Sequence, residues 1–83
     1  MPVIKVNKVV DLPLAGIRRL MKKAGAERVT KEAVETLRDI TEQFVIRIAK
    51  LAVEFAESQQ RKSLMKEDII RAIKVLSYGL STE

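Results

Sequence analysis

The feature that most constrains this chain is its middle third, residues 31–58, which contains neither glycine nor proline. Apolar residues recur through it at intervals of three and four, the spacing of one helix face. Thr30, just before it, is a typical helix N-cap. We predict a single helix from Lys31 to Ser58, roughly 40 Å long at about 1.5 Å per residue. Its apolar stripe comprises Val34, Leu37, Ile40, Phe44, Val45, Ile48, Leu51, Ala52, Phe55 and Ala56.

A shorter helix is predicted before the long one. Pro13 suits the first helical position, with Asp11 or Leu12 as the cap, because the missing N–H of proline would be unpaired there anyway. Gly25 suits the left-handed residue that follows a helix end. The β-branched segment 2–10 before it is compatible with a short strand, an ordered arm or a loose tail.

A third helix is predicted near the end of the chain. Glu67 and Asp68 are anions of the kind that helix N-termini favour, and Gly79 is expected to end the helix. We therefore predict one all-α domain over residues 12–79, with an N-terminal extension at 1–11 and a C-terminal tail at 80–83.

The apolar stripe of the long helix predicts a partner. Two helices of about three turns cannot cover both this stripe and their own apolar faces, and an exposed stripe of that size marks an interface. An 83-residue chain also buries a low fraction of its surface. We therefore expect a dimer in which two long helices cross.

Composition removes most catalytic chemistry. The chain has no cysteine and no histidine, which excludes disulfides, tetrahedral zinc sites and catalytic triads that use either residue. No P-loop or other glycine-rich phosphate loop is present. We expect no enzyme activity, no metal and no cofactor. The chain lacks an apolar run of membrane-spanning length and a recognisable signal peptide, so a cytoplasmic location without membrane attachment is expected.

The positive charge is concentrated. The net charge is +5, and two basic groups account for it, one around the first helix and one before the third. Loops and helix starts offer phosphates both side chains and backbone N–H groups. Phe44 and Phe55 belong to the apolar stripe, which argues against base stacking on single strands. The two basic groups are Arg18, Arg19, Lys22, Lys23, Arg28 and Lys31, and then Arg61, Lys62 and Lys66.

Four short runs carry a family resemblance. They are LPLA at 12–15, AGAERVT at 24–30, RKSL at 61–64 and EDI at 67–69. From Leu12 to about Ile73 the chain resembles an archaeal histone. The resemblance implies a histone fold, with a short, a long and a short helix joined by two strand loops, forming a handshake dimer. It also implies wrapping or compaction of double-stranded DNA at the chromosome, or nucleoid.

The resemblance also implies DNA-binding residues. Arg19 and Arg28 match arginines that enter the minor groove, which read groove width rather than base identity. Lys62 matches a phosphate-binding lysine. Ser63 replaces a threonine whose hydroxyl supports the loop arginine. Further candidates for phosphate contact are Arg18, Lys22, Lys23 and Thr30.

Other matched positions are structural. The resemblance implies that Arg61 and Asp68 pair within the chain. It also implies a contact between dimers through Phe55, Ser58, Asp68 and Arg71, where the family usually has histidine at position 58 and an apolar residue at position 71. A buried, unpaired Arg71 would be costly. Continuous stacking of dimers is therefore not expected, and a tetramer or larger assembly that bridges DNA stays open.

A second function remains open beside the first. A histone-fold subunit can pair with a different protein, in a transcription-related complex, with DNA secondary. Arg19, Arg28 and Lys62 favour the DNA-compacting homodimer, whereas Ser58 and Arg71 mildly favour the second function. The extension at 1–11 fits either another assembly contact or DNA binding through its lysines.

Overall fold

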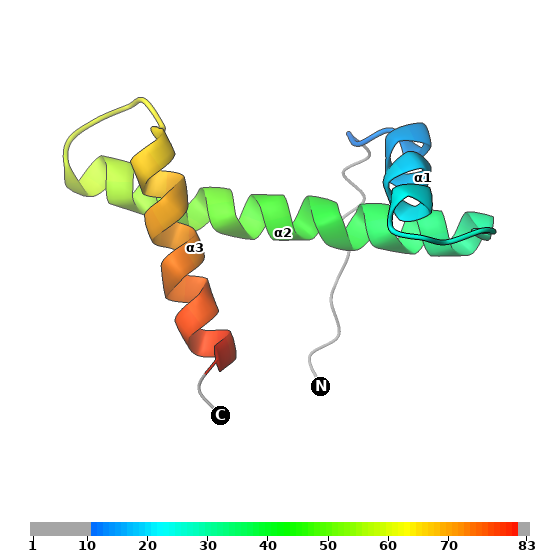
Figure 1. The fold of residues 1–83 in the computed structure, drawn as a ribbon. Coiled ribbons are helices and arrows are strands. Elements are labelled where there is room, and N and C mark those ends of the chain that lie inside the picture. The colour runs from blue at the N-terminus through cyan, green and yellow to red at the C-terminus, as the bar shows by residue number, and fades with distance from the viewer. Residues whose placement is uncertain (1–10, 82–83) are drawn as a thin grey trace. The chain divides into compact units, whose positions relative to one another are not determined.

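The computed structural model describes residues 11–81 of the chain, which form three helices, α1 (Leu14–Lys23), α2 (Lys31–Ser58) and α3 (Lys66–Ser81) (Figure 1). The all-α prediction is confirmed. No strand forms between residues 11 and 81, so the strand loops implied by the resemblance are irregular here. A single extended segment has no ladder partner to pair with. The strand or arm considered for residues 2–10 lies outside the described residues.

α1 begins one residue later than predicted. Pro13 is the cap rather than the first helical residue, with an extended backbone at φ −72° and ψ 138°. The expected ending is present, because Gly25 has φ 115°. The Gly25 N–H donates to the Lys22 carbonyl at 3.0 Å, and the Ala26 N–H donates to the Met21 carbonyl at 3.2 Å. This pair of bonds is a Schellman motif, which satisfies carbonyls at the helix end.

α2 has the predicted bounds. The Ala33 N–H donates to Thr30 Oγ1 at 3.1 Å, so the expected N-cap is present. Its C-terminus repeats the ending of α1 without a glycine. Gln60 takes a left-handed φ of 58°, and the N–H groups of Gln60 and Arg61 donate to the carbonyls of Glu57 and Ala56 at 2.9 and 3.0 Å.

α3 extends beyond the predicted end. It passes through Gly79 and continues to Ser81, so the expectation that Gly79 ends this helix is wrong. Glycine permits a left-handed ending but does not impose one. At the other end, Asp68 stabilises the helix start, because its Oδ2 accepts the Met65 N–H at 2.9 Å. This is the contact that the third helical residue makes with the cap residue in a capping box.

The chain divides into two compact units, residues 1–44 and 45–83. In the first unit, Ile17 of α1 and Val34 of α2 are buried. In the second, Ile48 and Ala52 of α2 form a core with Ala72 of α3. The side chains packed around that core are Leu51, Phe55, Ile69 and Leu76.

The two left-handed residues predict opposite effects of substitution. Gly25→Ala should lower the free energy of unfolding by about 1–2 kcal/mol, because an L side chain is strained at positive φ. Gln60→Gly should raise it by up to about 1 kcal/mol, because the same strain is relieved. Urea unfolding at one fixed protein concentration measures both changes. A less stable Gln60→Gly variant would contradict this account of the second loop.

Candidate nucleic-acid interface

α1 carries a basic surface, formed by Arg19, Lys22 and Lys23 with Arg18 beside them. Its sequence, LAGIRRLMKK, contains four basic residues and no acidic one. Burial of Ile17 fixes which side of the helix faces inward, and Arg18 beside it is half-buried. The side chains of Arg19, Lys22 and Lys23 are exposed. Lys22 and Lys23 lie in the last turn, where cations also interact favourably with the helix dipole.

The loop between α1 and α2 adds one arginine and a helix start. Arg28 is exposed, between the Schellman motif of α1 and the cap of α2. Thr30 is exposed as well, but its oxygen already accepts the Ala33 N–H. Thr30 therefore holds the start of α2 in place, and the loop exposes Arg28 beside it. These candidate residues all belong to the first unit.

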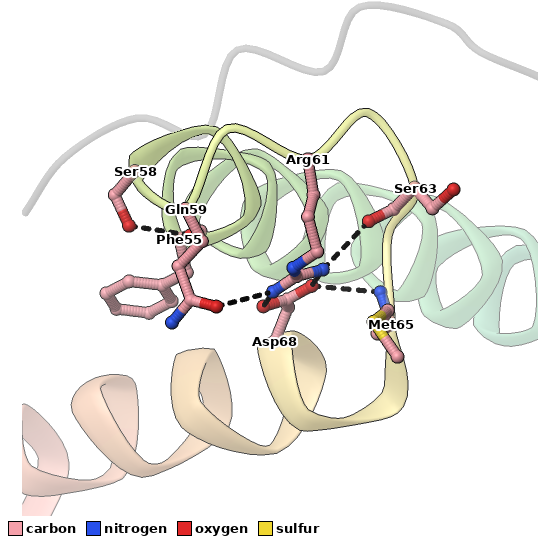
Figure 2. Close-up of polar contacts among 7 residues, drawn as sticks. All are labelled: Phe55, Ser58, Gln59, Arg61, Ser63, Met65 and Asp68. Atoms are coloured by element: carbon pink, nitrogen blue, oxygen red, sulfur yellow. Dashed lines mark hydrogen bonds and ion pairs between the residues drawn. The ribbon is translucent and has the colours of Figure 1, made fainter.

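In the second unit, Arg61 and Asp68 form the paired cluster of Figure 2. Arg61 Nη2 donates to Asp68 Oδ1 at 2.9 Å, and Nη1 donates to Oδ2 at 3.0 Å. Nη1 also donates to the Ser63 carbonyl at 3.1 Å. Asp68 is 4% exposed, so this two-point ion pair is shielded on the carboxylate side.

The cluster shifts the ionisation of both partners. The hydrogen bonds from Arg61 and then from the Met65 N–H hold the Asp68 pKa below its ordinary value. The bond to Asp68 raises the pKa of Arg61. Both charges are therefore stabilised by each other, and Arg61 has little capacity left for an outside anion.

The neighbouring loop residues remain available. Lys62 and Ser63 are exposed, and the Ser63 backbone is held through its carbonyl by Arg61. Within this basic loop, Arg61 therefore has a structural role, whereas Lys62 is exposed. The role of Lys62 and of the Ser63 hydroxyl toward DNA stays a prediction.

The four residues assigned to a contact between dimers lie in the second unit. Arg71 is exposed, and its Cζ lies 5.3 Å from the centre of the Phe55 ring, a cation–π distance. Ser58 Oγ donates to the Phe55 carbonyl at 2.7 Å (Figure 2). Arg71 has its own aromatic partner in this structure, and Asp68 is engaged by Arg61.

One polar anchor was missed by sequence reasoning. Glu42 of α2 is 6% exposed. Its Oε2 accepts the N–H groups of Asp11 and Leu12, both at 2.6 Å. Along the sequence, Glu42 is only one of several acids on a long helix, and nothing nearby distinguishes it from Glu35.

The described residues form neither of two other kinds of site. Across residues 11–81, no group of three or more acidic side chains is placed to hold a metal ion. None of the helices described there is long and apolar enough to span a membrane.

Comparison with known proteins identifies the family. The family model for histone-like transcription factors (CBF/NF-Y) and archaeal histones matches residues 10–73. The chain belongs to this family. The matched region contains α1 and α2 whole, both loops and the first half of α3. The three-helix arrangement is therefore that of the histone fold.

Individual relatives fall into the two branches that the family name joins. This histone-family chain is 42% identical over 66 residues to one of the subunits of archaeal histone HAN1 from Thermococcus zilligii. It is 33% identical over 66 residues to probable archaeal histone 3 of Methanocaldococcus jannaschii. Each match covers 80% of this chain and 98% of the relative.

The transcription-factor branch matches over a smaller share of the relative. Nuclear transcription factor Y subunit beta of Dictyostelium discoideum is 38% identical over 69 residues. That match covers 81% of this chain but 14% of the relative. The chain spans nearly the full length of the two archaeal relatives.

Proposed function

We propose that this histone-family protein is an architectural DNA-binding protein. It forms a homodimer, binds double-stranded DNA with little sequence preference, and wraps, compacts or bridges it at the chromosome. The observation that carries the proposal is that basic side chains of α1 and of both loops are exposed, while Arg61 is held internally. The two archaeal relatives, named as histones and matched over 98% of their length, support the same function.

Dimer formation is supported by the apolar surface of α2. Leu37, Ile40 and Phe44 are 40, 46 and 53% exposed, although they continue the stripe that is buried at other positions of the helix. Side chains of this size at helical spacing are costly to leave in water. A second copy of the same helix supplies a matching stripe, because a two-fold interface uses the same patch on both partners.

DNA binding is supported by the type of contact that the basic groups can make. Arginine and lysine on loops and helix ends reach phosphates and the minor groove, and neither contact identifies bases directly. The loop between α1 and α2 contains one acidic residue, Glu27, and the loop between α2 and α3 contains none. Acidic residues follow each loop in the first turn of the next helix, Glu32 in α2 and Glu67 and Asp68 in α3. The second loop is therefore positive, whereas on the first loop Glu27 balances Arg28, and the positive charge there comes from the adjoining helix ends through Lys22, Lys23 and Lys31.

The proposal is tested by affinity for random-sequence duplex DNA across a salt series, with the protein mass measured alongside. Six to ten phosphate contacts should lower the affinity by roughly 10³ to 10⁵ between about 50 and 200 mM salt. The logarithm of the affinity falls linearly with the logarithm of the salt concentration, and the slope of that line reports the number of phosphate contacts. Arg28→Ala and Lys62→Ala should each reduce the size of this slope by about 1 and weaken binding to all sequences alike.

The control is Lys50→Ala, which removes an exposed lysine of α2 outside both basic groups. It should leave the slope nearly unchanged. A shallow slope for the unaltered dimer, or a loss confined to one DNA sequence in the Arg28 variant, would rule the proposal out.

A second candidate function is supported by the transcription-factor relatives. The same apolar stripe of α2 can pair with a different histone-fold protein, within a transcription-related complex. Sedimentation of the pure chain separates the two functions. A homodimer at micromolar concentration supports the architectural role, whereas a chain that stays monomeric and poorly folded supports a different partner.

A further inference from the structure

The buried carboxylate of Glu42 has a clear structural contact but no role in the proposed interface. Its Oε2 accepts two backbone N–H groups, from Asp11 and Leu12, at 2.6 Å each. These are the last two donors before α1, because Pro13 has no N–H. Hydrogen bonds to a charged acceptor are among the strongest in proteins. A residue in the middle of α2 thus holds the chain just where α1 begins.

The start of α1 has little other support. Its cap residue, Pro13, makes no side-chain hydrogen bond, and the first turn contains no acidic residue. The bond closest to the cap, from the Ile17 N–H to the Pro13 carbonyl, is long at 3.4 Å. Among the described residues, no ion pair to Glu42 is present. Within residues 11–81, the polar contacts that the structure gives this carboxylate are therefore the two backbone N–H groups just before α1.

The anchor bears on DNA binding because α1 carries the basic surface. Arg19, Lys22 and Lys23 are exposed on a helix of only ten residues. A helix this short is not stable without its packing. We infer that Glu42 is a positioning residue for the basic surface of α1, and that phosphate binding by this surface depends on its carboxylate. This inference rests on the proposed DNA-binding function.

The inference predicts a change in DNA affinity opposite to the one expected from charge alone. Removing a carboxylate from a DNA-binding protein should ordinarily strengthen binding, because repulsion of phosphate falls. Glu42→Gln should instead weaken binding. Glutamine has nearly the same size, but it is neutral and brings N–H donors to a place where the backbone already presents two donors.

The experiment compares Glu42→Gln with Glu35→Gln in the full chain. Glu35 lies seven residues earlier, on the same side of α2, and is half-exposed. Affinity for random-sequence duplex DNA is measured from 50 to 200 mM salt, with helix content checked by circular dichroism. We expect Glu42→Gln to lose about tenfold in affinity near 100 mM salt and about 1 in slope, the equivalent of one phosphate contact. Glu35→Gln should bind equally well or slightly tighter.

A second measurement uses no DNA. Hydrogen exchange at the Asp11 and Leu12 amides should accelerate in Glu42→Gln and stay unchanged in Glu35→Gln. A well-folded Glu42→Gln variant that binds DNA as tightly as the unaltered chain would overturn the inference and leave the DNA-binding function standing. If the unaltered chain fails to bind DNA, the proposed function fails, and with it this role for Glu42. Unchanged amide exchange would refute the anchor itself.

Discussion

Phe44→Glu should abolish self-association of the chain. The side chain is 53% exposed in the single chain and lies within the apolar stripe of α2. Burying a phenylalanine contributes about 1.5–3 kcal/mol, and a two-fold interface loses this contribution twice. The substitution also places two carboxylates in an apolar interface, which adds a desolvation cost. The dimer dissociation constant should rise at least about a thousandfold, equivalent to roughly 4 kcal/mol.

Analytical ultracentrifugation over a concentration series measures this effect. Thr36→Glu is the matched control, because it adds the same charge to an exposed position on α2 outside the apolar stripe. It should remain dimeric, with a dissociation constant within a few fold of the unaltered chain. If Phe44→Glu also stays dimeric, the stripe is not the interface, and the basis of the proposed homodimer is lost.

Asp68→Asn should cause the largest loss of stability among single polar substitutions in the second unit. The substitution removes the buried charge that binds Arg61 at two points and weakens the bond to the Met65 N–H. It leaves the guanidinium with an uncharged partner, and breaking one side of a shielded ion pair is strongly destabilising. We expect the midpoint of thermal unfolding to fall by roughly 10 °C or more.

The pH dependence of stability follows from the lowered pKa of Asp68. In the folded protein the carboxylate stays ionised at pH values where the unfolded chain has already bound a proton. The contribution of the pair is therefore complete above the ordinary aspartate pKa of about 3.9, and it is lost as the pH falls from there through the lower folded value.

Thermal unfolding between pH 2 and 7 measures this contribution. In the unaltered chain the unfolding midpoint should fall as the pH is lowered. This fall should be much smaller in Asp68→Asn, whereas it should be unchanged in Glu67→Gln, which alters an exposed neighbour in the same helical turn. An unchanged acid decline in Asp68→Asn would show that other carboxylates control stability in this range.

Local signals made the long helix predictable. Neither glycine nor proline interrupts residues 31–58, and Thr30 and Gly25 each form a hydrogen bond with a residue three positions away. Where a residue type is compatible with more than one position in a helix, the observed helix bounds differ from the predicted ones. Pro13 tolerates both the cap and the first helical position, and Gly79 tolerates a continuing helix.

The candidate site was predictable only in part. The basic groups are visible in the composition of α1 and the loops, but the pairing of Arg61 with Asp68 came from family resemblance. Spacing alone could not separate the structural Arg61 from the exposed Lys62 beside it. The Glu42 anchor joins residues about thirty positions apart, so no local pattern could reveal it. The same is true of Arg71 over Phe55, sixteen positions apart.

The exposed apolar stripe of α2 also has a consequence for protein turnover. If the chain pairs as proposed, dilution lowers its stability, because only the dimer covers Leu37, Ile40 and Phe44. Newly made copies that have not met a partner are the ones that proteases reach first. The amount of folded protein in a cell should therefore rise more steeply than the rate of its synthesis, and a modest drop in expression should remove a disproportionate share of it.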